Sequence, residues 1–295
     1  MKVLLLGATG DLGSRLVPAL LTHGLTVTCF VRSAGKLRGL LPPTVSDQIT
    51  IREGDAKQSA TVKKAILESD CDAVVSAAGV AAAAPWGKTD LPEIFKAVLQ
   101  GIQEACVERQ KPIRVWFVAG MGVLNYPGTD KLISSYVPLY VAHRQNLRLI
   151  KTSPPSTLMD WSMLCPMTMK AKSSDLSSPT KIKQGKLTAN ATTPPLWHNS
   201  RLRLIPLLGK TLTVARNASR YETTLEQNAD FIAADLESFE IPSPSATHWC
   251  SHAIRGHVHS AEQQYDSLLP RFAPVQEAST ILKDARLPVP AVASA

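Results

Sequence analysis

The sequence predicts an α/β fold built on a doubly wound parallel sheet, with a smaller C-terminal region attached to it. Apolar runs suited to buried strands alternate with helical segments over residues 1–165, and a glycine-rich turn links the first run to the first helix. This alternation stops at Pro166. We therefore expect a first domain at residues 1–165 and a region at residues 166–295 that packs on it without forming an independent domain.

The first strand is expected at residues 2–6, directly before a GxxGxxG sequence at 7–13. Glycines permit a tight turn, let a phosphate approach backbone amides, and let the next helix pack closely on the strand. The spacing is not the usual GxGxxG, but its position between a strand and a helix predicts a dinucleotide site. Pro18 is expected to kink or shorten that helix, at 12–20. The expected cofactor residues here are Gly7, Thr9, Gly10, Asp11, Leu12 and Gly13.

The second strand is expected at residues 25–31 and is followed by Arg32. In a Rossmann-type fold this strand end meets the adenosine ribose. An acidic side chain there binds the 2′-hydroxyl of NAD, whereas a cation binds the 2′-phosphate of NADP. Arg32, with Ser33 and Lys36 after it, therefore predicts NADP(H) as the cofactor. The alternative is an exposed basic turn on a basic protein.

Three further strands are expected at residues 48–55, 73–79 and 113–118, with helices at 60–68 and 92–109. Ligands of parallel sheets bind outside the carboxyl ends of the strands. The cofactor is therefore expected to pass the residues at these ends, which are Asp55, Ala56, Ala77, Ala78, Gly79, Ala119, Gly120 and Met121. Asp55 could instead cap the helix that follows it. Residues 80–91 are expected to form a loop over the cofactor.

The order of these motifs resembles a known family. The glycine-rich turn, FVRS at 30–33, EGDA at 53–56 and MDWSMLCP at 159–166 look like the NmrA-like, atypical short-chain dehydrogenase/reductase group, and within it are similar to flavin reductase/biliverdin reductase B. The resemblance covers residues 1–170, with a weaker match at 223–232. It implies a Rossmann domain, an NADP cofactor whose site includes His143 and Pro166, and a substrate region made largely from the C-terminal half.

The residues expected to act on a substrate depart from those of ordinary short-chain reductases, which use a serine after the fifth strand and a Tyr-x-x-x-Lys motif. Here residues 119–121 carry no hydroxyl, and Tyr140 is followed by Arg144, which does not lose its proton in proteins. His143 can exchange a proton near neutral pH. The catalytic candidates are His143, Tyr140 and Arg144, with Tyr136 as a weaker one. A structural histidine bonded to backbone is the alternative.

The chain after Pro166 is irregular in pattern. Residues 170–220 suggest long loops, and the apolar and basic residues at 201–220 are expected to be partly buried. Four side chains could line an apolar substrate pocket or could be ordinary packing, namely Met121, Met167, Met169 and Trp197. A last helix is expected at 225–238.

Together these observations predict an NADPH-dependent oxidoreductase acting on an apolar small molecule, such as an imine, carbonyl or polycyclic specialised metabolite. An NADP-bound cyclase or isomerase and a non-catalytic NADP(H)-sensing regulator are the alternatives, because the usual serine and lysine are missing. The oligomeric state stays open.

Composition narrows the class of protein further. The net charge is +8, but the cations look dispersed and aromatic residues make up 5% of the chain, which argues against nucleic-acid binding. No apolar run is long enough for a membrane span. Five scattered cysteines predict reduced thiols in a cytoplasmic protein. The irregularly spaced histidines at 248, 252, 257 and 259 predict no metal site.

Overall fold

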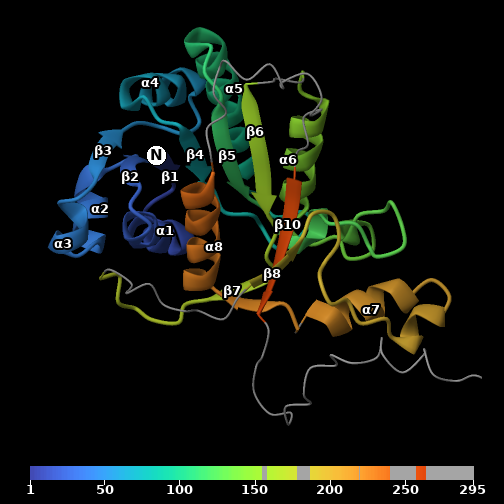
Figure 1. Ribbon diagram of the computed structural model, residues 1–295. Helices are drawn as coiled ribbons and strands as arrows, with labels where there is room; N and C mark the ends of the chain where they lie inside the picture. The colour runs from blue at the N-terminus through green and yellow to red at the C-terminus, as the bar shows by residue number, and fades with distance from the viewer. Residues whose placement is uncertain (155–157, 178–186, 219, 240–256, 264–295) are drawn as a thin grey trace, which may run out of the picture. The chain divides into compact units, whose positions relative to one another are not determined.

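A mostly parallel sheet forms the centre of the protein in the computed structural model, which describes residues 1–154, 158–177, 187–218, 220–239 and 257–263 (Figure 1). In these residues the sheet has eight strands in the order β3-β2-β1-β4-β5-β6-β10-β8. Each neighbouring pair from β3 to β10 is parallel, and β8 runs antiparallel to β10. The strand order reverses between β1 and β4, where doubly wound sheets bind ligands.

The five strands expected from the sequence are all present, and with β6 they form the first part of the sheet. These strands are β1 (Lys2–Leu6), β2 (Thr26–Val31), β3 (Thr50–Glu53), β4 (Ala73–Ser76) and β5 (Ile113–Val118), followed by β6 (Met159–Leu164). All four residues of β4 are buried, as a central strand covered on both faces requires. The predicted doubly wound parallel fold is therefore confirmed.

Helices cover both faces of the sheet (Figure 1). Alternate residues of β1 show this, because Val3 and Leu5 belong to one buried cluster and Leu4 and Leu6 to another. The first cluster includes α1 (Asp11–Thr22), α2 (Ala34–Leu40), α3 (Pro43–Ser46) and α8 (Leu225–Ser238). The second includes α4 (Ser59–Ser69), α5 (Leu91–Arg109) and α6 (Val141–Thr152).

Helix α1 runs unbroken through Pro18, so the expected shortening of its early turns is wrong. Eight of its twelve residues are buried. This packing outweighs the one backbone hydrogen bond that a proline removes. Helix α8 closes over α1, where His23 contacts Asp230 (2.9 Å) and Glu237 (2.5 Å) through its two ring nitrogens.

The part after Pro166 has more regular structure than the expected long loops. A small parallel sheet joins β7 (Thr168–Lys170) to β9 (Glu222–Thr224), and the main sheet gains β8 (Leu187–Asn190) and β10 (His257–Gln263). Short 3-10 helices occur at η1 (Met121–Val123), η2 (Ile133–Ser135) and η3 (Arg201–Leu204), and α7 spans Gly209–Ala218. The expected partial burial of 201–220 is confirmed for Val214 of α7 but is wrong for Leu204, Ile205, Leu207 and Leu208, which are exposed.

Three further observations concern membrane-spanning helices, cysteines and metal ligands. Of the helices in the described ranges, none has the length and apolarity needed to cross a bilayer. The cysteines within those ranges are free and buried, and Cys250 lies outside them. His248 and His252 also lie outside the described residues, within which no group of three or more side chains is arranged to hold a metal ion.

Candidate functional site

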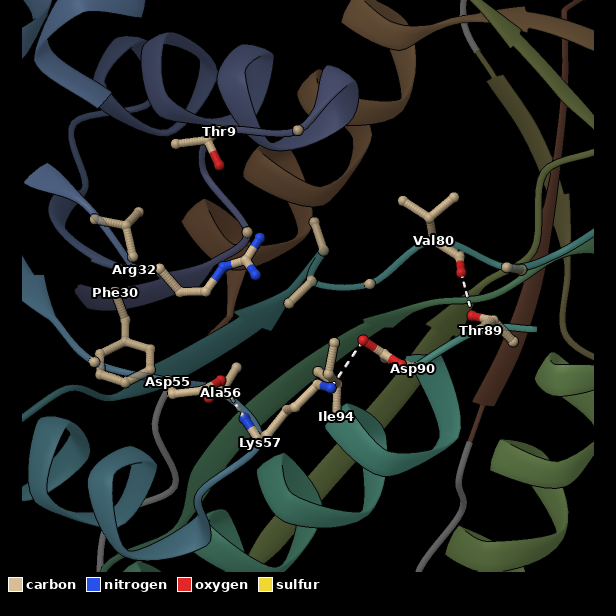
Figure 2. Close-up of a pocket in the computed structure, with 18 of the residues that line it drawn as sticks. Thr9, Phe30, Arg32, Asp55, Ala56, Lys57, Val80, Thr89, Asp90 and Ile94 are labelled. Atoms are coloured by element: carbon tan, nitrogen blue, oxygen red, sulfur yellow. Dashed lines mark hydrogen bonds and ion pairs between the residues drawn. The ribbon is translucent and has the colours of Figure 1, made fainter. Parts of the chain in front are cut away.

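A cavity of about 630 Å³ opens at the carboxyl ends of β1, β2, β3 and β4 (Figure 2). Loops that follow these four strands form most of its wall, and Ile94 of α5 completes it. Among the predicted cofactor residues, those that line the cavity are Gly7, Thr9, Gly10, Arg32, Lys36, Asp55, Ala56, Ala77, Ala78 and Gly79. The cavity therefore lies at the point where the strand order reverses.

Two glycines hold the turn at the edge of the cavity. Gly7 has φ +85°, and a Cβ there would lie 2.6 Å from backbone atoms of Ala77 and Ala78. A Cβ at Gly13 would lie 2.0 Å from the Gly7 carbonyl oxygen. These contacts set β1, the loop after β4 and the start of α1 at distances that only glycine permits.

The start of α1 faces the cavity with free backbone donors. Gly10 is the N-cap residue, and no side chain caps the helix. The amides of Asp11, Leu12 and Gly13 in the first turn are therefore available to an anion. Apart from the Gly7 carbonyl oxygen at 3.4 Å, no atom lies close to the space that a Cβ of Gly10 would occupy.

Three cations that line the cavity form no ion pair with any described residue, namely Arg32, Lys36 and Lys88. Figure 2 shows Arg32 reaching into it from the end of β2. Within the described part of the chain, neither Arg32 nor Lys36 forms an ion pair, whereas Lys57 on the far wall pairs with Asp90 (2.8 Å) and Glu93 (3.1 Å). The hydrogen bonds that Lys57 donates to these two carboxylates raise the pKa of Lys57. The charges of Arg32 and Lys36 remain available to a phosphate.

Ser33 and Asp55 have local roles as well. The Ser33 hydroxyl accepts a hydrogen bond from the Lys36 amide (3.2 Å) and caps α2, and it does not line the cavity. Asp55 lines the cavity and accepts from the Lys57 amide (3.0 Å), while the N-cap of α4 is Gln58. The expectation that Asp55 caps this helix is therefore wrong, because three residues of turn separate it from the helix start.

The loop after β4 forms another part of the wall, at residues 80–82 and 88–90. Thr89 donates a hydrogen bond to the carbonyl of Val80, which closes the loop on itself, and accepts one from the Leu91 amide (3.1 Å). The loop also contacts α6, because the Tyr140 amide donates to the Ala83 carbonyl (3.0 Å). It thus connects the cavity to the helix that carries His143.

The ends of β5 and β6 come together beside that helix. The Ala119 amide donates to Leu164 (2.8 Å), and the Met121 amide donates to Pro166 (2.9 Å). His143 packs over Gly120, since a Cβ there would lie 3.2 Å from the imidazole Cδ2. Burial lowers the pKa of His143 to about 4, so the ring is neutral at pH 7. Its Nδ1 is buried and has no partner among the described residues.

Tyr140 and Arg144 do not join His143 at this position. Tyr140 is 44% exposed and has φ +51° at the residue before α6, and Arg144 is exposed on the helix surface. Neither lines the cavity. Of the three predicted catalytic residues, only His143 lies against the end of β5.

A tyrosine and a lysine pair elsewhere, at a place that the sequence spacing did not suggest. Lys210 of α7 donates to the Tyr136 hydroxyl (3.1 Å), although the two residues are 74 positions apart. Burial opposes ionisation of this phenol, but the hydrogen bonds with Lys210 and Thr129 and the charges of Lys210 and Lys131 together outweigh it and lower the pKa of Tyr136. No local motif could reveal this pair, because the lysine comes from α7, which the sequence analysis did not predict.

The four predicted substrate residues are not brought together. Met121 and Trp197 pack with the cluster that includes α4 and α5, and Trp197 contacts the Tyr126 ring (5.4 Å between centroids). Met169 packs with the other cluster, and Met167 is exposed.

Phe30 also lines the cavity, although the sequence pattern did not indicate it, and its ring lies over Gly54. A Cβ at Gly54 would lie 2.5 Å from that ring.

Comparison with known proteins assigns the family. The sequence model of the NAD(P)H-binding family matches residues 7–193, well over half of the chain. The chain belongs to this NAD(P)H-binding family. This agrees with the resemblance to the NmrA-like, atypical short-chain dehydrogenase/reductase group. No curated protein sequence matches the chain.

Solved structures of low sequence identity share the fold. A short-chain dehydrogenase/reductase from Veillonella parvula has 12% identity and a TM-score of 0.54, over 92% of this chain and 99% of that one. ChuY, an anaerobilin reductase from Escherichia coli O157:H7, has 15% identity and a TM-score of 0.53, over 92% and 100%. A second structure of a Veillonella parvula short-chain dehydrogenase/reductase, in complex with NADP, has 13% identity and a TM-score of 0.50, over 89% and 94%.

Proposed function

We propose that this NAD(P)H-binding protein is an NADPH-dependent reductase of an apolar small molecule, with an imine, carbonyl, flavin or quinone as the group reduced. The observation that carries the proposal is the position of His143. Its neutral imidazole lies on Gly120 at the end of β5, one loop away from the cavity, with a buried Nδ1 that no described residue contacts. A buried polar atom without a partner indicates a ligand or a water at that point.

The cavity fits a dinucleotide with a 2′-phosphate. The uncapped start of α1 suits the pyrophosphate, and Arg32 with Lys36 suits the additional phosphate that distinguishes NADP from NAD. Both cations lack protein partners within the described residues, so binding would not break an existing ion pair. The relative with bound NADP supports the same choice. A bound NADPH would supply the hydride for the reduction.

The residues around His143 would position the acceptor and supply the proton that it takes up on reduction. With a pKa of about 4 the imidazole is a hydrogen-bond partner at neutral pH rather than a charged acid. The Tyr136 hydroxyl, held by Lys210, is a second group able to give up a proton. We assign the part after Pro166, with its exposed Met167 and its Trp197, to the substrate side of the protein.

Turnover of NADPH tests this function directly. We expect the purified chain to oxidise NADPH with at least one acceptor from a panel of flavins, quinones, imines and aldehydes. His143→Gln should lower kcat by on the order of a hundredfold, which is the lower end of the range for a positioned acid–base group. Tyr140→Phe is the matched control on the same helix, and its exposed hydroxyl should contribute little.

A non-catalytic NADP(H)-sensing regulator is the second candidate. It is favoured by the exposure of Tyr140 and Arg144, which leaves the cavity without the usual Tyr-x-x-x-Lys arrangement. Tight NADPH binding without oxidation by any acceptor in the panel would contradict the reductase and support the sensor. Full turnover by His143→Gln would retain the reductase but remove His143 from its mechanism.

A further inference from the structure

The positive charge of this chain is concentrated in one stretch rather than dispersed. Residues 176–221 contain eight Lys and Arg and no Asp or Glu, so they carry the whole of the net charge of +8. The remainder of the chain is balanced. The expectation of dispersed cations is therefore wrong, and the dinucleotide cavity does not account for the excess, because Arg32, Lys36, Lys57 and Lys88 lie outside this stretch.

Large apolar side chains are exposed within the same stretch. Five of them reach solvent within nine residues that run from the end of η3, through the turn at 205–208, to the first turn of α7. They are Leu204 (76% exposed), Ile205 (44%), Leu207 (101%), Leu208 (60%) and Leu212 (39%), which we call the Leu204–Leu212 patch. Arg201 and Arg203 are exposed directly before the patch, and Arg216 is exposed one turn after Leu212. Adjacent exposed apolar side chains of this size mark an interaction surface.

Specific contacts hold this segment with its apolar side outward. A Cβ at Gly209 would lie 2.4 Å from the Leu202 carbonyl, so α7 starts in direct contact with η3. On the inner side of α7, Thr211 donates to the Tyr136 carbonyl (3.0 Å) and Asn217 is fully buried and bonded to His198. Thr211 and Asn217 of α7 thus face the protein, and the exposed leucines at its start are a fixed feature of the fold.

The charge around the patch selects the kind of partner. A twofold contact between two copies would place Arg201 and Arg203 against the same patch of the other copy, where like charges repel. A protein partner would need a pocket for Leu207, which protrudes fully at a turn with φ +63°. A lipid layer accepts protruding apolar side chains without a matching pocket, and acidic headgroups attract the arginines beside them.

We propose that the Leu204–Leu212 patch docks the protein onto an anionic membrane surface. Leucine and isoleucine side chains enter the boundary between headgroups and acyl chains, while Arg201, Arg203 and Arg216 contact acidic headgroups. The binding is peripheral and reversible, since the patch is short. It runs only from the end of η3, through the turn at 205–208, to the first turn of α7. This membrane contact is independent of whether the chain reduces a substrate or senses NADP(H).

Sedimentation with vesicles tests the proposal on the full chain. We expect the protein to bind vesicles of phosphatidylcholine mixed with phosphatidylserine, and to bind much less to phosphatidylcholine alone. Leu207→Glu combined with Leu208→Glu should abolish binding. Arg201→Glu combined with Arg203→Glu should weaken it on the order of tenfold or more. High salt should weaken binding by the wild type as well.

The control substitution is Val107→Glu, which changes an apolar residue of α5 that is 63% exposed and lies outside the patch. This variant should bind vesicles as the wild type does. Thermal unfolding of every variant checks that the substitutions leave the fold intact. Absence of binding to both vesicle types would overturn the proposal, and so would equal binding by the Leu207→Glu, Leu208→Glu variant. A concentration-dependent dimer abolished by that variant, without vesicle binding, would assign the patch to a second copy.

Discussion

Single residues at the cavity are constrained by backbone contacts more than by side-chain chemistry. Gly7 combines a positive φ with a close approach to the backbone after β4, and Gly13 contacts the Gly7 carbonyl. The glycine-rich turn at residues 7–13 therefore also fixes how closely β1, the loop after β4 and α1 pack together. A substitution there should reduce both stability and cofactor affinity.

We predict that Gly7→Ala lowers the free energy of unfolding by about 2 to 4 kcal/mol and greatly weakens NADPH binding, because the new Cβ meets backbone atoms at a positive φ. Gly24→Ala is the matched control, since Gly24 also has a positive φ (+72°) but no atom within 4 Å of the added Cβ. It should cost about 1 kcal/mol and leave NADPH affinity unchanged. Urea unfolding and a binding titration measure both effects. Similar losses from the two variants would contradict the backbone contact as the cause.

The sequence could predict those residues of the site that follow a strand in a local motif. Gly7, Arg32 and Ala77 are of this kind, and all three line the cavity. It could not predict the Tyr136 and Lys210 pair, which depends on where α7 folds back. It also could not separate Tyr140 from His143, because neighbours on one helix differ in exposure only once the helix is packed.

At the scale of elements, the strands through β5 and the helices α1, α4 and α5 were predictable because apolar runs alternate with amphipathic helices there. The prediction failed after Pro166, where β7, β8 and β9 are three or four residues long and pair with partners distant in sequence. Such short strands carry too few residues for a periodic pattern. Helix α8 is the exception, because it has a long apolar face and a capping box at Thr224 and Gln227.

The contact between α1 and α8 gives a prediction about pH. Burial opposes protonation of His23, but hydrogen bonds to Asp230 and Glu237 outweigh it and raise the pKa of His23. A raised pKa in the folded state means that this contact stabilises the protein fully below the unfolded pKa of about 6.5 and less as the pH rises through the folded value. His23→Asn should therefore cost on the order of 1 kcal/mol more at about pH 6 than at about pH 9.

Unfolding by urea at the two pH values measures this difference. Asp47→Asn, which removes a charge that forms no ion pair in the described residues, is the control and should show no such pH dependence. A cost of His23→Asn that stays constant with pH, or grows as the pH rises, would contradict the charged His23 contact.

At the scale of the whole molecule, the cofactor cavity and the Leu204–Leu212 patch are two surfaces with different proposed functions. The cavity lies at the carboxyl ends of β1 to β4, and Arg32 and Lys36 line it. We propose that these two cations bind the 2′-phosphate of NADPH. The region after Pro166 supplies the Leu204–Leu212 patch, within a stretch at residues 176–221 that contains eight Lys and Arg and no Asp or Glu. The fold is shared with solved structures of low sequence identity, and we propose that side chains at the end of β2 select the cofactor.

The central claim is that Arg32 selects NADPH by binding its 2′-phosphate. The most direct measurement is the ratio of NADPH to NADH affinity by titration calorimetry for the wild type, Arg32→Glu and Arg38→Glu, the last being a cation of α2 that does not line the cavity. Arg32→Glu should weaken NADPH binding far more than NADH binding and lower the ratio of the two affinities by on the order of a hundredfold. The reason is that the 2′-phosphate loses a charged hydrogen-bond partner and is repelled by the new carboxylate. Arg38→Glu should leave the ratio unchanged. An equal ratio in the wild type and Arg32→Glu would contradict the claim.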